Sequence, residues 1–132
     1  MEDVESRRWR WLPPILWALG LFWFVTRPVV MPLPWQFPGM DKIAHALLYA
    51  PFGALMRRSI DDRVGPAGPG GQALAIVAIV AVTHGGIVEW RQSHVPGRSA
   101  EAWDVAADLA GALAGAWLLS VSRWARASGA SR

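Results

Sequence analysis

The sequence predicts an all-α polytopic membrane protein, with four transmembrane helices in a compact bundle and both termini in the cytoplasm. Hydrophobic residues make up 53% of the 132-residue chain, and charged residues make up only 17%. Residues 11–26, 73–82 and 109–121 are almost free of polar side chains on every helical face. A helix that is apolar all round is either buried in protein or surrounded by lipid. The chain is too short to bury several such helices, so we expect lipid.

We expect a single domain, residues 1–132, in which each helix needs about 20 residues to cross the hydrocarbon core. The first helix is expected at about residues 9–27, with Pro13 and Pro14 near its start, where a missing backbone donor is tolerated. Arg27 and Pro28 follow it, where a signal peptide would have a small-residue cleavage site. We therefore interpret this segment as a retained helix.

The other three helices are expected at about residues 41–58, 72–90 and 101–124. Pro51 is expected to kink the second helix. Four prolines in residues 28–39 exclude a regular helix there and predict an extended or interfacial loop. Residues 61–71, rich in Gly and Pro, predict a flexible polar turn between the second and third helices.

The distribution of Lys and Arg predicts the orientation. With the N-terminus inside, nine of these residues lie on the cytoplasmic side and four on the outer side, which favours two cytoplasmic termini. The inner group is Arg7, Arg8, Arg10, Arg57, Arg58, Arg63, Arg123, Arg126 and Arg132. The outer group is Arg27, Lys42, Arg91 and Arg98. Tryptophans near the predicted helix ends, such as Trp9, Trp35, Trp90 and Trp124, fit the aromatic belts of a bilayer.

Composition also limits the partners. The chain has no Cys, which excludes disulfides and thiolate metal sites. Its basic residues, which raise the pI to about 10.6, adjoin apolar segments rather than forming a soluble basic face. We interpret them as contacts to anionic lipid headgroups and expect the lipid bilayer, not nucleic acid, as the partner.

Two charged segments adjoin the apolar stretches, residues 41–45 and 89–111, and both fall at the predicted outer face. Ionisable groups next to hydrocarbon are costly, so they indicate a functional site or a partner. The proposed ligand-binding residues are Asp41, Lys42, His45, Glu89, Gln92, Arg98, Asp104 and Asp108. The inner half carries Arg residues and the Asp61-Asp62 pair, which we interpret as an ordinary solvated pattern.

Spacing places several of these residues on shared helix faces. Asp41 and His45 are four residues apart and so lie on one face. Asp104, Asp108, Gly111 and Gly115 form one stripe, polar near the outside and small further in. The glycines fit close helix packing, within one chain or between chains of a homo-oligomer. The stripe should therefore face the bundle, and Asp108, too deep for a capping role, needs a partner or water.

Simpler structural interpretations stand beside the functional one. Asp41 and Glu101 fit helix capping, because carboxylates are favourable near a helix N-terminus. His84 is most simply a hydrogen-bonded pocket histidine, and His45 is open to the same interpretation. Arg98 is equally suited to bind a lipid phosphate or to pair with an acidic neighbour.

At this point the chain resembles the VanZ-like family of small bacterial membrane proteins. The resemblance covers roughly residues 41–115 and rests on several short motifs in the family's order. These are Asp41-Lys42-x-x-His45, Glu89-x-x-Gln92, Pro96-Gly97-Arg98-Ser99, and Asp104 with Gly111. The chain departs from the pattern at Asp108, where the family usually has Asn, and this puts a neutral amide role there in doubt.

The resemblance implies a four-helix domain in the bacterial cytoplasmic membrane. The family's naming member is associated with low-level resistance to the glycopeptide teicoplanin, but the resemblance implies no defined reaction. We expect the outward-facing pocket to bind an envelope component, such as a lipid-linked or peptidoglycan precursor or a glycolipid. Arg98 and Lys42 would then hold phosphate or carboxylate.

Three alternatives remain at the level of sequence. A membrane-embedded hydrolase or transferase is one, since Asp41, His45, Glu89 and Asp104 are residue types of acid–base pairs and divalent-metal sites. However, no spacing-defined metal motif or nucleophile elbow is present, so we assign no metal, no cofactor and no catalytic residue. Proton movement and a purely structural or assembly role are the other two.

Overall fold

The computed structural model describes residues 9–28, 38–64 and 71–129. Within these ranges the chain forms four helices and no strand. The helices are α2 (Leu12–Val25), α3 (Met40–Val64), α4 (Gly71–Gln92) and α5 (Ala102–Gly129). The predicted all-α class is confirmed. Most of the proline-rich segment, together with Arg7, Arg8, Trp35 and Arg132, lies outside the described residues.

The helix bounds differ from the sequence prediction at particular ends. The first helix is shorter than expected, with 14 residues, or about 21 Å at 1.5 Å per residue. The second continues through Pro51 to Val64, six residues past its expected end at Arg58. The polar residues after Arg58 are thus helical rather than part of a turn, since charged side chains do not themselves end a helix. The fourth extends five residues beyond Trp124.

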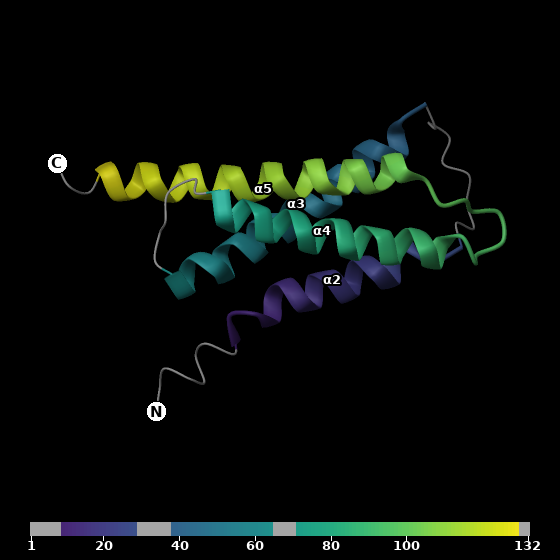
Figure 1. The fold of residues 1–132 in the computed structure, drawn as a ribbon, viewed down its shortest axis with the longest axis horizontal. Coiled ribbons are helices and arrows are strands. Elements are labelled where there is room, and N and C mark those ends of the chain that lie inside the picture. The colour runs from purple at the N-terminus through teal and green to yellow at the C-terminus, as the bar shows by residue number, and fades with distance from the viewer. Residues whose placement is uncertain (1–8, 29–37, 65–70, 130–132) are drawn as a thin grey trace.

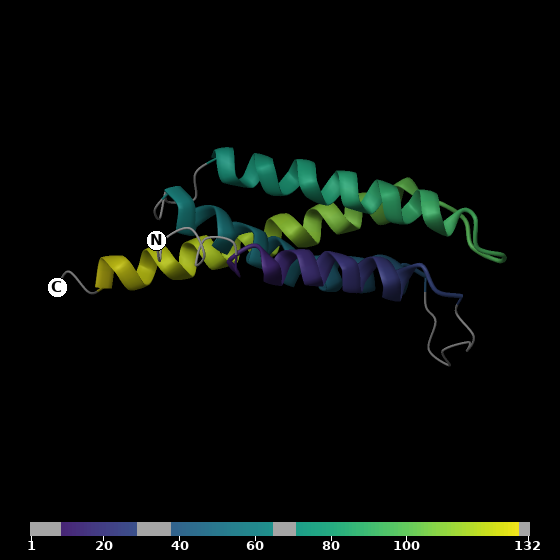
Figure 2. The same ribbon diagram turned by 90° about the horizontal axis from the view of Figure 1, so that it is seen from below.

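The four helices alternate in direction along the long axis of the molecule (Figures 1 and 2). At one end, on the right in Figure 1, α2 and α4 end and α3 and α5 begin. We call this the loop 93–101 end, and the opposite one the terminal end, because α2 begins and α5 ends there. Residues of the two charged segments are therefore brought to the same end of the bundle.

The closest packing in the bundle is between α3 and α5, where glycines replace larger side chains. A Cβ atom added at Gly111 would overlap the backbone carbonyl of Ala46, and one at Gly115 would overlap that of Ala50. In the opposite direction, a Cβ atom added at Gly53 of α3 would overlap the backbone carbonyl of Ala112 of α5. The predicted small-residue stripe of α5 therefore packs within one chain, and the two backbones approach closely because these residues have no side chain.

Apolar side chains lie on both the inside and the outside of the bundle. The core includes Tyr49, Phe52 and Val77, all buried, and Leu21 of α2 packs against it. Large apolar side chains also cover the outer faces of all four helices, for example Leu19, Leu47, Ile79 and Leu118. Two helices, α4 and α5, are long and apolar enough to cross a membrane.

The terminal end differs from the solvated pattern expected there. Arg57 is fully buried, and its Nε atom lies 2.7 Å from Oδ1 of Asp61, which is itself buried. Arg123 of α5 reaches the other oxygen of the same carboxylate at 3.4 Å. The expectation of solvated charges was wrong for this pair, because the extension of α3 carries Asp61 into contact with Arg57 one turn earlier and with α5.

Candidate functional site

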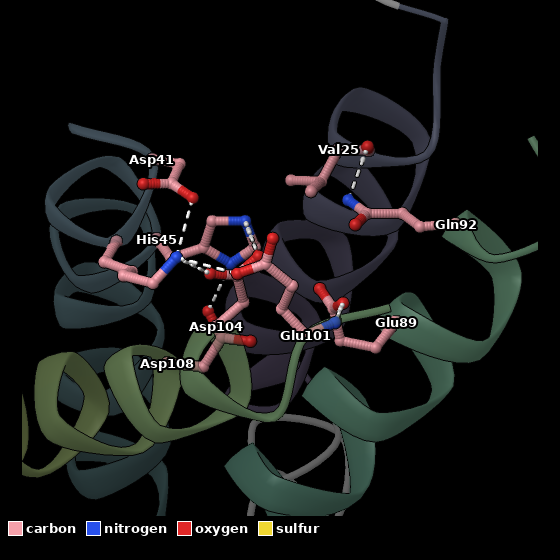
Figure 3. A network of polar contacts seen from close by, with 9 residues as sticks. Val25, Asp41, His45, Glu89, Gln92, Glu101, Asp104 and Asp108 are labelled. Carbon is pink, nitrogen blue, oxygen red and sulfur yellow. Dashed lines mark hydrogen bonds and ion pairs between the residues drawn. The ribbon is translucent and has the colours of Figure 1, made fainter. Parts of the chain in front are cut away.

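A polar cleft of about 590 Å³ opens at the loop 93–101 end. Its walls come from the start of α3, the end of α4, the loop after it and the first turn of α5 (Figure 3). Six of the eight predicted binding residues line it: Asp41, Lys42, His45, Gln92, Arg98 and Asp104. The other two, Glu89 and Asp108, are buried beside it and contact residues of the wall. The structure thus brings together all eight.

Two glycines shape the rim of the cleft. Gly39, before α3, has φ +87°, and Gly97, in the loop after α4, has φ +80°. Side chains rarely tolerate this region of φ, so glycine is the residue that fits. The N–H of Arg98 donates to the carbonyl of Val95 at 3.1 Å, and the Pro96-Gly97 pair between them matches the type II β-turn preference. This turn brings Arg98 and Ser99 to the cleft.

Lys42 is surrounded by three carboxylates. Its Nζ atom lies 2.8 Å from Asp41, 3.0 Å from Glu101 and 3.2 Å from Asp104. Asp41 and Glu101, for both of which helix capping was considered, accept hydrogen bonds from this ammonium group. Because Lys42 is already neutralised by several acidic groups, it is poorly suited to hold an anionic ligand. Glu101, directly before α5, was not among the predicted binding residues, because helix capping explained an acidic residue at the expected start of that helix.

His45 and Asp108 form the deepest contact of the site. Nδ1 of His45 lies 2.8 Å from Oδ1 of Asp108, whose side chain is fully buried. The predicted partner for Asp108 is thus His45. Gly85 of α4 makes room for this carboxylate, since a Cβ there would lie 2.6 Å from Oδ2 of Asp108. The other ring nitrogen of His45 faces Asp104 at 3.9 Å, which is too long for a hydrogen bond.

Glu89 and Gln92 join neighbouring segments to α4. Oε2 of Glu89 accepts a hydrogen bond from the backbone N–H of Glu101 at 2.7 Å, which ties the start of α5 to α4. The Gln92 amide donates to the carbonyl of Val25 at 2.9 Å, at the end of α2. Helix ends leave such carbonyls without an intrahelical partner, and this bond supplies one for Val25. The Gln92 amide N–H therefore already has a structural partner.

Arg98 is the cation of the cleft that has no acidic partner. It is half-buried, and no side chain of residues 9–28, 38–64 or 71–129 forms a hydrogen bond or an ion pair with its guanidinium group. The considered pairing of Arg98 with an acidic neighbour does not occur among the described residues. A guanidinium group offers several donors in a planar fork, which suits phosphate and carboxylate. The cleft therefore has one available anion-binding group beside a mainly acidic wall.

A second polar chain lies deeper in the bundle. The hydroxyl of Tyr49 lies 2.7 Å from Nδ1 of His84, and Nε2 of His84 lies 3.0 Å from the carbonyl of Ala18. A carbonyl only accepts, so Nε2 donates to it, and in the neutral ring Nδ1 accepts from the Tyr49 hydroxyl. The interpretation of His84 as a hydrogen-bonded pocket histidine agrees with this geometry. The Tyr49–His84 contact could not be predicted, because one sequence does not show a hydroxyl facing a histidine 35 residues away.

Among the described residues, two sets of side chains have ligand atoms close enough for one cation. In each set the atoms lie within 4.8 Å of one another. The inner set is His45, Glu89 and Asp104, all buried, and the outer set is Asp41, Glu101 and Asp104. The outer set already surrounds the ammonium group of Lys42. The inner set is thus the better candidate to hold a metal ion.

Comparison with models of known protein families, with curated proteins and with solved structures finds no match to this chain.

Proposed function

We propose that this chain is a multi-pass protein of the bacterial cytoplasmic membrane whose polar cleft binds the anionic headgroup of a lipid-linked envelope component. The observation that carries the proposal is the cleft of about 590 Å³, in which Arg98 has no acidic partner among the described residues. The cleft lies at one end of helices whose outer faces are apolar. A lipid molecule offers both complementary parts, a charged headgroup and an apolar tail.

The membrane location is supported by the distribution of polar and apolar groups. Buried positions include Arg57, His45 and Asp108, while large apolar side chains are exposed on every helix. In water such apolar surfaces would be unfavourable, since soluble monomers rarely expose large contiguous apolar patches. In lipid the same surfaces are favourable, and the ionisable groups face the bundle interior, as they do in membrane proteins.

The VanZ-like resemblance supports the same proposal from a different direction. Most of the residues that carry it, including Asp41, His45 and Arg98, come together at one end of the bundle around the cleft. A link to glycopeptide resistance belongs to this proposal, since such antibiotics act on envelope precursors. The positive-inside count supports an outward-facing cleft, where those precursors would be met.

Binding of a polyprenyl phosphate lipid by the purified protein in detergent tests the proposal. We expect saturable binding that is much tighter than binding of the uncharged polyprenol of equal length. Arg98→Ala should weaken phosphate-lipid binding by about 10- to 100-fold, because a hydrogen bond to a charged group contributes about 1.5–3 kcal/mol.

Arg91→Ala is the matched control, since Arg91 is an exposed cation at the same end of the bundle and does not line the cleft. It should bind like the native chain. Equal binding of phosphate lipid and polyprenol, or native affinity in a folded Arg98→Ala variant, would contradict the proposed function.

A further inference from the structure

The inner face of the cleft contains carboxylate oxygens that lack hydrogen bonds. Glu89 is only 4% exposed and Asp104 only 6% exposed. Within the described part of the chain, Oε1 of Glu89 and Oδ1 of Asp104 are buried and accept no hydrogen bond. Lys42 lies 3.2 Å from the Asp104 oxygen and compensates its charge in part. A buried polar atom without a partner is costly, so the Glu89 oxygen in particular indicates a ligand that supplies the missing interaction, because the Asp104 oxygen already has Lys42 beside it.

The nearby histidine is oriented as metal-binding histidines usually are. Nδ1 of His45 is hydrogen-bonded to the buried carboxylate of Asp108 at 2.8 Å. This bond directs the other ring nitrogen, Nε2, toward Asp104, at 3.9 Å. A carboxylate behind the ring fixes the tautomer and makes the free nitrogen a better metal ligand. A separation of 3.9 Å is too long for a hydrogen bond but suits two ligands that flank one ion at about 2.0–2.2 Å each.

We propose that His45, Glu89 and Asp104 bind a divalent transition-metal ion, with Asp108 as the residue that positions His45. The potential ligand atoms of the three residues lie within 4.8 Å of one another. They come from three different helices, α3, α4 and α5, so that the bound ion would join all three at the loop 93–101 end.

The chemistry of the ligands favours Zn²⁺. Imidazole suits transition metals, whereas Mg²⁺ and Ca²⁺ prefer oxygen ligands alone. Three protein ligands leave one position of a tetrahedral zinc ion open. His45 and Asp104 line the cleft, so that this position would face it. The metal proposal does not depend on the identity of the lipid ligand, because its evidence is the geometry of side chains alone.

The test is titration of Zn²⁺ into the full-length chain, purified in detergent and stripped with a chelator, by isothermal titration calorimetry. We expect one Zn²⁺ per chain and no comparable binding of Mg²⁺. Glu89→Gln should weaken Zn²⁺ binding by at least about 10-fold, since even residues behind the ligands have effects of that size. Glu101→Gln, which removes a carboxylate from the outer set only, should retain binding, and so should His94→Ala.

X-ray absorption of the zinc-loaded native chain gives a second measurement that needs no variant. We expect one imidazole and otherwise oxygen ligands. Absence of Zn²⁺ binding by the folded native chain, a zinc shell with no imidazole, or native affinity in Glu89→Gln would overturn the proposal. Loss of binding in Glu101→Gln equal to that in Glu89→Gln would also overturn it, because the ion would then lie in the outer set.

Discussion

At the scale of residues, the buried aspartates Asp108 and Asp61 show how far a single sequence reveals partners. Asp108 was predicted to need a partner, because it lies on the glycine stripe and too far along its helix for capping. Its partner, His45, is 63 residues away, and sequence spacing does not identify such a pair. Asp61 was interpreted as solvated, although Arg57 stands one helical turn before it. The four-residue spacing of Arg57 and Asp61 could have predicted this ion pair. It was missed because the helix was expected to end at Arg58, before Asp61.

Asp61→Asn should destabilise the protein strongly. The change removes the buried carboxylate that faces both Arg57 and Arg123 and so weakens the charge compensation of the buried Arg57 guanidinium group. Breaking a buried ion pair costs about 3–5 kcal/mol. Thermal unfolding in detergent, followed by circular dichroism, measures the effect. Asp41→Asn is the comparison, since Asp41 is exposed and its ion pair should contribute little. Equal unfolding temperatures for the two variants would contradict the role assigned to Asp61.

At the scale of elements, the α3–α5 pair positions the site. Asp104 and Asp108 lie on the same buried stripe of α5 as Gly111 and Gly115, so that close packing of the glycines sets how deeply the aspartates enter the bundle. The sequence predicted this stripe correctly from its spacing. The sequence left open whether the glycines pack within one chain or between chains. In the structure they pack within the chain, against Ala46 and Ala50 of α3.

Gly115→Ala should destabilise the bundle because the added methyl group would overlap the carbonyl of Ala50. Inserting a methyl group into a packed interior typically costs about 1–3 kcal/mol. Gly86→Ala is the matched control, because Gly86 lies in a helix with no atom within 4 Å of the added Cβ. That change should be neutral or stabilising by up to about 1 kcal/mol, since alanine favours helix. Denaturation midpoints of the two variants provide the measurement, and similar values would exclude close α3–α5 packing.

At the scale of the whole molecule, most of the buried charged groups lie at the two ends of the bundle, while the Tyr49–His84 pair lies between them. The acidic cleft, with its histidine and two cations, occupies the loop 93–101 end, and the Arg57–Asp61 pair occupies the terminal end. Apolar outer faces lie between them on all four helices. Two of these helices, α4 and α5, are long and apolar enough to cross a membrane.

Cysteine labelling tests the proposed orientation, and the native chain has no Cys to interfere. Ser99 is exposed at the cleft, and Ala127 is exposed near the end of α5. In intact cells, Ser99→Cys should react with a membrane-impermeant thiol reagent, while Ala127→Cys should react only after the membrane is permeabilised. The reverse pattern would place the cleft in the cytoplasm, and labelling of both in intact cells would exclude a membrane-spanning bundle.

The sequence by itself determined the all-α class, the number of described helices, and the residues that meet at one end. These properties follow from local signals, namely apolar segments of helical length, turn residues, and charges whose position along each helix is set by the rise per residue. The tertiary structure decided the pairings. It pairs His45 with Asp108 and Lys42 with three carboxylates. It also joins the Gln92 amide to the Val25 carbonyl, while Arg98 has no acidic partner among the described residues of the cleft. Such pairings depend on how helices distant in sequence are rotated and how closely they pack, and no periodicity within one helix contains that information.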